Sequence, residues 1–90
     1  MESEQLRIFV AVAKYKSFSE AARKLYISHS TTSRAVSALE KELGVKLVER
    51  DNHVSALTPA GQVMLEEAQR LLTALDESVE RVKAAAEETQ

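Results

Sequence analysis

The feature that most constrains the fold is a pair of helix-start signals at Ser19 and Ser28. Each serine precedes an apolar pattern of helical spacing, and a serine hydroxyl in that position accepts a hydrogen bond from a free backbone N–H group. The first signal predicts a short helix over residues 19–25, and the second predicts a longer helix over about residues 29–43. Gly44 supplies the stop, because glycine readily adopts the left-handed conformation that ends a helix. The sequence therefore predicts two helices joined by a tight turn.

The longer predicted helix has two contrasting faces. Helical spacing gathers an apolar stripe on one face, formed by Thr32, Val36, Leu39 and Leu43. Small hydroxyl and basic side chains fall on the opposite face, at Ser30, Ser33, Arg34, Ser37 and Lys41. Small hydroxyl groups allow a helix to approach the base edges in a DNA major groove. A helix-turn-helix over about residues 18–37 is therefore predicted, with its second helix in the groove.

Patterns on both sides of this unit extend it to a winged helix-turn-helix. Residues 3–15 have apolar positions at helical spacing and predict a first helix. After Gly44, residues 45–48 suggest a short strand and residues 54–57 a second one, with turn chemistry at residues 51–53 between them. This hairpin is the wing of a mainly α fold with three helices and a long last helix. The predicted core includes Phe18, Ala21, Ala22, Leu25, Ile27, Val36, Leu39 and Leu47.

The last predicted helix is long and carries a heptad seam. Thr58 can cap its start, and Pro59 suits its first position, where a missing N–H costs nothing. Apart from Gly61, nothing interrupts the helix up to about residue 88, so its length is about 45 Å. Its apolar positions alternate by three and four residues, at Leu65, Ala68, Leu72, Leu75, Val79, Val82 and Ala86. Two interpretations stand: the whole seam lies against its own domain, or part of it packs on a partner chain.

The charge of the chain is unevenly distributed. Residues 1–58, the expected winged domain, carry nine basic and seven acidic residues. Residues 59–90, the expected linker and dimerisation helix, carry three basic and seven acidic residues. An acidic tail on a mildly basic head is compatible with nucleic-acid binding by the head alone. The lack of cysteine and of an apolar run long enough to span a membrane favours a soluble, cytoplasmic protein with no membrane association.

Catalytic and metal-binding functions are not supported by the sequence. His29 and His53 are the only histidines, and neither has a metal-ligating partner at helical spacing. Gly44 and Gly61 are the only glycines, so the chain has no glycine-rich phosphate loop. We therefore expect no enzyme activity, no metal site and no cofactor.

Short motifs follow one another along nearly the whole chain. They are Leu6-x-x-Phe9, Ser17-Phe18-Ser19-x-Ala21-Ala22-x-x-Leu25, Ser28-x-Ser30-x-x-Ser33-Arg34, Leu39-Glu40-x-x-Leu43-Gly44-Val45-x-Leu47, Arg50 and Leu57-Thr58-x-x-Gly61. In this order and spacing they resemble the LysR-type bacterial transcription regulators. The resemblance implies a homodimer in which the long linker helix of one chain pairs with that of the other. The two winged heads of this dimer bind a double-stranded DNA operator, and the full-length protein could also form a tetramer. It also implies a two-lobed domain for a small-molecule effector, absent from these ninety residues, so we expect an excised fragment or a natural truncation.

The resemblance and the two-faced pattern of the predicted helix over residues 29–43 together assign the site residues. DNA contacts are expected at Ser28, His29, Ser30, Thr31, Ser33, Arg34, Ser37, Arg50, Asn52 and His53. Dimer contacts are expected at Leu65, Ala68, Leu72, Leu75, Val79 and Val82. Two departures from the family bear on operator preference. His29 replaces the usual glutamine, and residues 51–53 of the wing lack the usual basic or glycine residues.

Some assignments have open alternatives. Ser28 is expected mainly as a helix cap, with the N–H groups beside it available to a phosphate. Arg50 either bridges the wing to a phosphate or has a structural role alone. The rival function is a winged-helix module that dimerises and binds only protein. The hydroxyl-and-arginine face argues against it, because protein-binding surfaces are richer in aromatic residues and methionine.

Overall fold

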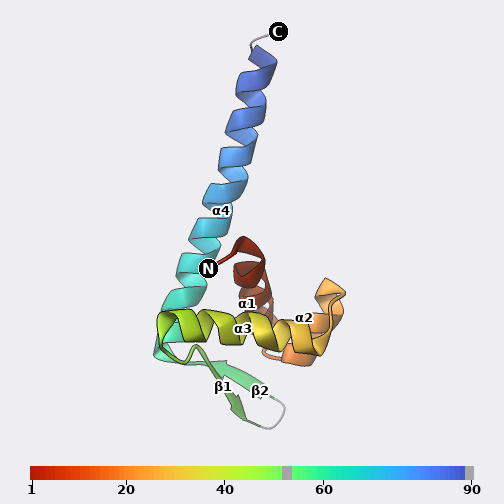
Figure 1. Ribbon diagram of the computed structural model, residues 1–90, viewed down its shortest axis with the longest axis vertical. Coiled ribbons are helices and arrows are strands. Elements are labelled where there is room, and N and C mark those ends of the chain that lie inside the picture. Colours follow the sequence, from red (N-terminus) through yellow and green to blue (C-terminus); the bar gives the residue numbers. More distant parts are fainter. Residues whose placement is uncertain (52–53, 89–90) are drawn as a thin grey trace.

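The computed structural model describes residues 1–51 and 54–88 of the chain. These residues form four helices and a two-stranded hairpin (Figure 1). The elements are α1 (Ser3–Tyr15), α2 (Phe18–Leu25), α3 (His29–Leu43), β1 (Val48–Asp51), β2 (Val54–Leu57) and α4 (Pro59–Glu88). The predicted fold class, a mainly α winged helix-turn-helix followed by a long helix, is confirmed.

The helix-turn-helix begins at a different serine from the one predicted. Ser17 has an extended backbone, and its Oγ accepts a hydrogen bond of 3.1 Å from the N–H of Glu20. Ser19 lies inside the first turn of α2, so its prediction as the cap is wrong. A cap at Ser17 places Phe18 at the first helical position, where its side chain is buried. Burial of this ring therefore accompanies the earlier start of the helix.

The helices α1, α2 and α3 enclose an apolar core. Its fully buried side chains include Phe9, Val12, Ala21, Val36 and Leu39. Thr32 is buried with them, and its hydroxyl donates to the backbone carbonyl of Ser28 at 3.0 Å, which satisfies the polar group. Leu25 and Leu43 were predicted to lie inside, but they are 37% and 41% exposed. Each is the last residue of its helix and projects past the edge of the core.

The hairpin is tied to the head by backbone hydrogen bonds. The antiparallel register pairs Val48 with Leu57, Glu49 with Ala56, Arg50 with Ser55 and Asp51 with Val54. The N–H of Ser55 donates to the carbonyl of Lys16, just after α1, at 3.1 Å. The first strand was predicted to begin at Val45, but β1 begins at Val48. The difference arises because the N–H of Val45 is used to close α3, donating to the carbonyl of Glu40 at 3.2 Å.

The helix α4 starts on the head and then extends away from it (Figure 1). The Thr58 cap is confirmed, since its Oγ1 accepts a hydrogen bond of 3.0 Å from the N–H of Gly61. Met64 and Ala68 are buried against the core, whereas the apolar side chains from Leu75 onward are exposed. The packed head therefore continues into the first turns of α4. The free part of the helix makes the molecule 56 Å long but only 26 Å and 19 Å across.

Candidate nucleic-acid interface

The helix α3 lies along one side of the head (Figure 1). Its polar face is open to solvent. The exposed members of this face are Ser30, Arg34, Ser37 and Lys41, and Ser33 is half-buried. The hydroxyls of the three serines form no hydrogen bond with residues 1–50 or 55–88. Their donors and acceptors are therefore available to an external partner.

The start of α3 is held by a pair of hydroxyl groups. The Oγ of Ser28 accepts a hydrogen bond of 3.0 Å from the N–H of Thr31, so the predicted cap is confirmed. The same Oγ donates to the Oγ1 of Thr31 at 2.8 Å. Because each hydroxyl engages the other, Ser28 and Thr31 chiefly stabilise the helix start. The first N–H groups of α3, at His29 and Ser30, have no intrahelical partner and can face an anion.

The polar face of α3 has two different borders. On one border, Thr31 and Arg34 line a shallow hollow of about 320 Å³ together with Glu4 and other residues of α1. On the other border, Ser33 lies two helical turns before Glu40, whose side chain is directed to the start of β1. Arg34 and Ser33 therefore lie on opposite edges of the surface that α3 offers to a partner.

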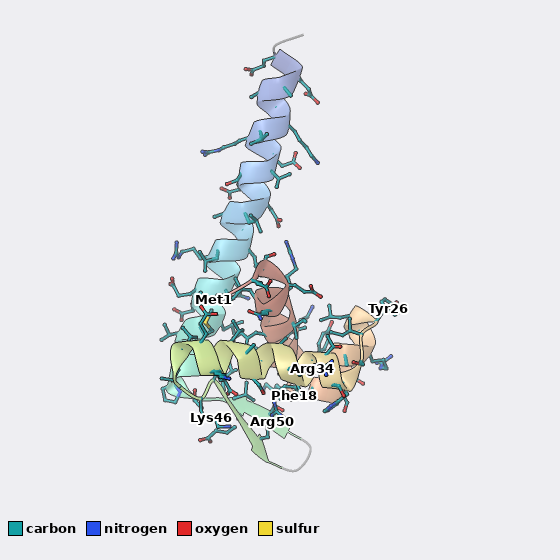
Figure 2. All side chains as sticks on the ribbon, viewed as in Figure 1. Met1, Phe18, Tyr26, Arg34, Lys46 and Arg50 are labelled. Atoms are coloured by element: carbon teal, nitrogen blue, oxygen red, sulfur yellow. The ribbon has the colours of Figure 1, made fainter. Side chains whose placement is uncertain are left out.

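Four basic side chains lie on α3, on β1 and just before β1, namely Arg34, Lys41, Lys46 and Arg50. None of them forms an ion pair with a side chain that the structure describes. Figure 2 shows Arg34, Lys46 and Arg50 along α3 and the hairpin. Arg23 differs, because its guanidinium hydrogen-bonds to Glu20 at 2.7 Å and thereby lowers the pKa of that carboxyl. Unpaired cations suit a polyanionic backbone, although the whole chain has a net charge of −2.

Arg50 lies on β1 with its guanidinium over an aromatic ring of α2. Its Cζ is 3.9 Å from the centroid of the Phe18 ring. The centroid of that ring lies 6.3 Å from the centroid of the His29 imidazole, at an interplanar angle of 44°. The structural role considered for Arg50 is therefore present, and its phosphate contact stays a prediction. The two other wing positions predicted to contact DNA, Asn52 and His53, lie outside the described residues.

Glu40 was not predicted as a site residue, yet it fixes the wing to α3. Its Oε2 accepts hydrogen bonds from the N–H of Leu47 at 2.8 Å and from the N–H of Val48 at 3.2 Å. Hydrogen bonds to a carboxylate are stronger than those between neutral groups. The motif Leu39-Glu40 was the only signal for this role. Its partners are backbone groups whose position depends on the turn after Gly44, so the motif alone does not reveal them.

The predicted dimer seam of α4 is divided into covered and uncovered positions. Ala68 is fully buried, while Leu65 and Leu72 are partly buried against the core of the head. The uncovered positions are Leu75, Val79 and Val82, which are 43%, 45% and 70% exposed. The interpretation in which the whole seam lies against its own domain is therefore wrong. Only the later part of the seam is available to a partner chain.

Metal binding and membrane insertion are two further possibilities for the residues that the structure describes, 1–51 and 54–88. No group of three or more His, Cys, Asp or Glu side chains in these ranges is arranged to hold a metal ion. No helix in the same ranges is both long and apolar enough to cross a membrane. The surface formed by α3 and the hairpin thus has the clearest chemistry for a ligand, and its charge favours an anionic one.

Comparisons with known proteins are in accord with this geometry. Residues 3–62 match the profile of the bacterial regulatory helix-turn-helix proteins of the lysR family. The HTH-type transcriptional regulator TfdS of Cupriavidus pinatubonensis is 47% identical, and ClcR of Pseudomonas putida is 46% identical. Each alignment covers 94% of this chain and 29% of the relative. TfdT of Cupriavidus pinatubonensis is 43% identical, over 96% of this chain and 38% of its own length.

Similar solved structures include complexes with DNA. The CbnR DNA-binding domain in its DNA complex has a TM-score of 0.93 and 42% identity, covering 96% of this chain and 99% of that chain. The BenM domain in complex with catB site 1 DNA has a TM-score of 0.90 and 41% identity, covering 96% of both chains. The chain spans between 29% and 38% of the length of the three curated relatives. By its profile, its relatives and its fold, it belongs to the LysR family of bacterial regulatory helix-turn-helix proteins.

Proposed function

We propose that this chain binds double-stranded DNA in a sequence-specific manner, as the DNA-binding part of a homodimeric transcription regulator. In this function α3 enters the major groove of the DNA, and the hairpin lies over the sugar-phosphate backbone next to that groove. The observation that carries the proposal is the surface of α3 and the hairpin, where free serine hydroxyls lie among cations that lack ion pairs in the described residues. Base edges and phosphates are the two contacts that specific binding requires, and this surface suits both.

The similar proteins support the same function. The CbnR and BenM domains were each crystallised with DNA, and this chain shares their fold over nearly its whole length. The curated relatives are transcriptional regulators and are about three times as long. We propose that a small-molecule effector acts through a domain that lies outside these ninety residues.

The positions of the site residues suggest separate roles. His29, Ser33 and Arg34 are proposed as base contacts, because they lie at the start and on the two edges of the outward face. Lys41, Lys46 and Arg50 are proposed as phosphate contacts, because they carry unpaired charge around that face. The remaining polar positions, Ser30 and Ser37, lie on the outward face and are proposed to approach the groove.

Selection of bound duplexes from a random DNA pool tests the proposal directly. We expect enrichment of a site with two-fold symmetry, because paired heads read two half-sites. We also expect the affinity for the enriched duplex to fall steeply as the salt concentration rises, since phosphate contacts release counterions. A module that binds only protein would give neither enrichment nor salt-dependent binding, and that result would overturn the proposal.

Arg34→Ala should weaken binding to the selected duplex by about 1–3 kcal/mol, and binding to a random duplex much less. The reason is that a base contact is made only with the preferred sequence. Lys41→Ala is the matched control, because loss of a phosphate contact should weaken binding to both duplexes about equally. Fluorescence anisotropy at one fixed salt concentration measures both effects. An equal loss on both duplexes for Arg34→Ala would reassign this residue to phosphate binding.

His29→Gln should change the bases that are selected in each half-site while leaving the affinity for random DNA nearly unaltered. A glutamine amide can form two hydrogen bonds to one adenine, whereas a neutral imidazole offers one donor and one acceptor on different sides of its ring. Repeating the pool selection with the variant measures the change. If the same sequences are enriched, His29 is a surface residue that takes no part in base recognition.

A further inference from the structure

The cation–aromatic contact between Arg50 and Phe18 joins the wing to the first helix of the helix-turn-helix. Figure 2 shows the two residues next to each other beneath α3. Phe18 is only 6% exposed and is fixed at the first position of α2, next to the Ser17 cap. Arg50 is exposed and lies in the middle of β1, opposite Ser55. A rigid ring therefore supports a side chain that would otherwise move freely in solvent.

The chemistry of the guanidinium group makes this contact compatible with a second one. The group is planar, its face can lie against an aromatic ring, and its five N–H donors point outward in its own plane. The Arg50 Cζ lies over the Phe18 ring, 3.9 Å from its centroid, a distance that suits contact through the face of the guanidinium. No carboxylate or carbonyl group within residues 1–50 and 55–88 accepts a hydrogen bond from its N–H groups. The cation is thus oriented while its donors stay available.

The same ring lies close to the start of the recognition helix. The centroids of Phe18 and His29 are 6.3 Å apart, within the range of interacting aromatic pairs. His29 is the first residue of α3, where the free N–H groups of the helix favour an anion. The Arg50 donors and the start of α3 therefore both lie close to a single buried ring.

We propose that Phe18 is a positioning residue for DNA binding, whose ring directs the Arg50 guanidinium toward a backbone phosphate beside the start of α3. The phosphate is the one that flanks the base approached by His29. This inference rests on the proposed DNA-binding function and adds to it a residue that does not itself touch DNA. Phe18 acts through Arg50 by reducing the number of conformations that the arginine must give up on binding.

A double-mutant cycle tests whether Phe18 acts through Arg50. Phe18→Leu, which keeps an apolar side chain but removes the ring, should weaken binding of the selected duplex about two- to fivefold. In an Arg50→Ala background the same change should have no further effect, because the cation that the ring orients is absent. Arg50→Ala should also reduce the slope of log affinity against log salt by about one phosphate contact.

Two further variants separate this role from a loss of stability. Phe18→Tyr keeps the aromatic ring, so this variant should bind the selected duplex with the same affinity as the unmodified chain. Phe9→Leu removes the other phenylalanine ring, which is fully buried in the core and lies under no cation of the described residues. It should lower the melting temperature while leaving the affinity of the folded protein for DNA unchanged.

The Arg50 Nε–H resonance gives a readout that needs no DNA. In the unmodified chain the ring current of Phe18 should shift it upfield, and Phe18→Leu should return it to an ordinary position, whereas Phe9→Leu should not. An unshifted resonance, or additive losses in the double-mutant cycle while the unmodified chain binds DNA, would overturn this inference alone. Failure of the unmodified chain to show salt-dependent DNA binding would overturn the proposed function and this inference with it.

Discussion

Replacing Leu75 and Val79 together with aspartate should convert the chain from a dimer to a monomer at micromolar concentration. These side chains are 43% and 45% exposed in a single chain and lie beyond the part of α4 that the head covers. A dimer that buries them would bury four added carboxylates, because each change occurs in both protomers. Burial of unpaired charge costs several kcal/mol, so the dissociation constant should rise by about a thousandfold or more. Sedimentation equilibrium and light scattering measure the change.

The choice of positions follows from the structure. Leu72 belongs to the same seam, but it packs against the core of the head, so a charge there would damage folding as well as association. Thr73→Asp with Ala84→Asp is the matched control, because it adds the same charge on the opposite side of α4. The control should remain dimeric. A monomer for the unmodified chain at these concentrations would contradict the proposed dimer.

The seam illustrates what the spacing of residues can and cannot predict. Heptad spacing correctly places Ala68 and Val79 on one side of a continuous helix. It cannot distinguish them, although Ala68 is fully buried and Val79 is 45% exposed. The difference depends on how far the head extends along α4, because its core is in contact with the helix only as far as Leu72. A periodic pattern therefore predicts which face of a helix is apolar, but it does not predict how many positions on that face are buried by the rest of the chain.

The ends of helices were predicted less well than their centres. Val36 and Leu39 are buried as their spacing predicted, but Leu43, on the same stripe, is 41% exposed. The core stops before the last turn of α3, and Leu47 is buried instead, at 1% exposure. The cap of α2 was placed two residues late because two serines, Ser17 and Ser19, precede the same apolar pattern. Local propensity favours either serine as the helix cap, whereas the burial of Phe18 favours Ser17.

The candidate site combines local features with contacts between distant segments. The polar face of α3 follows from helical spacing within a single element, so the sequence was sufficient to predict it. The contacts of Arg50 with Phe18 and of Glu40 with the start of β1 join residues on different elements. Their formation depends on how the hairpin is seated against the head. No spacing rule encodes that arrangement, and these contacts therefore emerged only from the structure.

Gly61→Ala should lower the free energy of unfolding by about 3 kcal/mol or more, the upper part of the range for an overpacked core. A Cβ at this position would overlap the carbonyl oxygen of Leu47, lie 3.0 Å from its carbonyl carbon and approach the Cβ of Leu57 at 3.3 Å. That oxygen cannot turn away freely, because it accepts a hydrogen bond of 3.0 Å from the N–H of Thr58. The added methyl group must therefore push α4 away from the strand residues that it packs against.

Thermal unfolding at one fixed protein concentration should show a melting temperature about 12 °C lower or more for Gly61→Ala. Gly44→Ala is the matched control. Its φ of 72° is left-handed, but nothing lies within 4 Å of the added Cβ, so only the backbone cost of about 1–2 kcal/mol applies. Lys16 and Tyr26 adopt similar conformations at φ of 53° and 58° without being glycine, which shows that this fold tolerates them. A smaller loss for Gly61→Ala than for Gly44→Ala would contradict the close packing of α4 on Leu47.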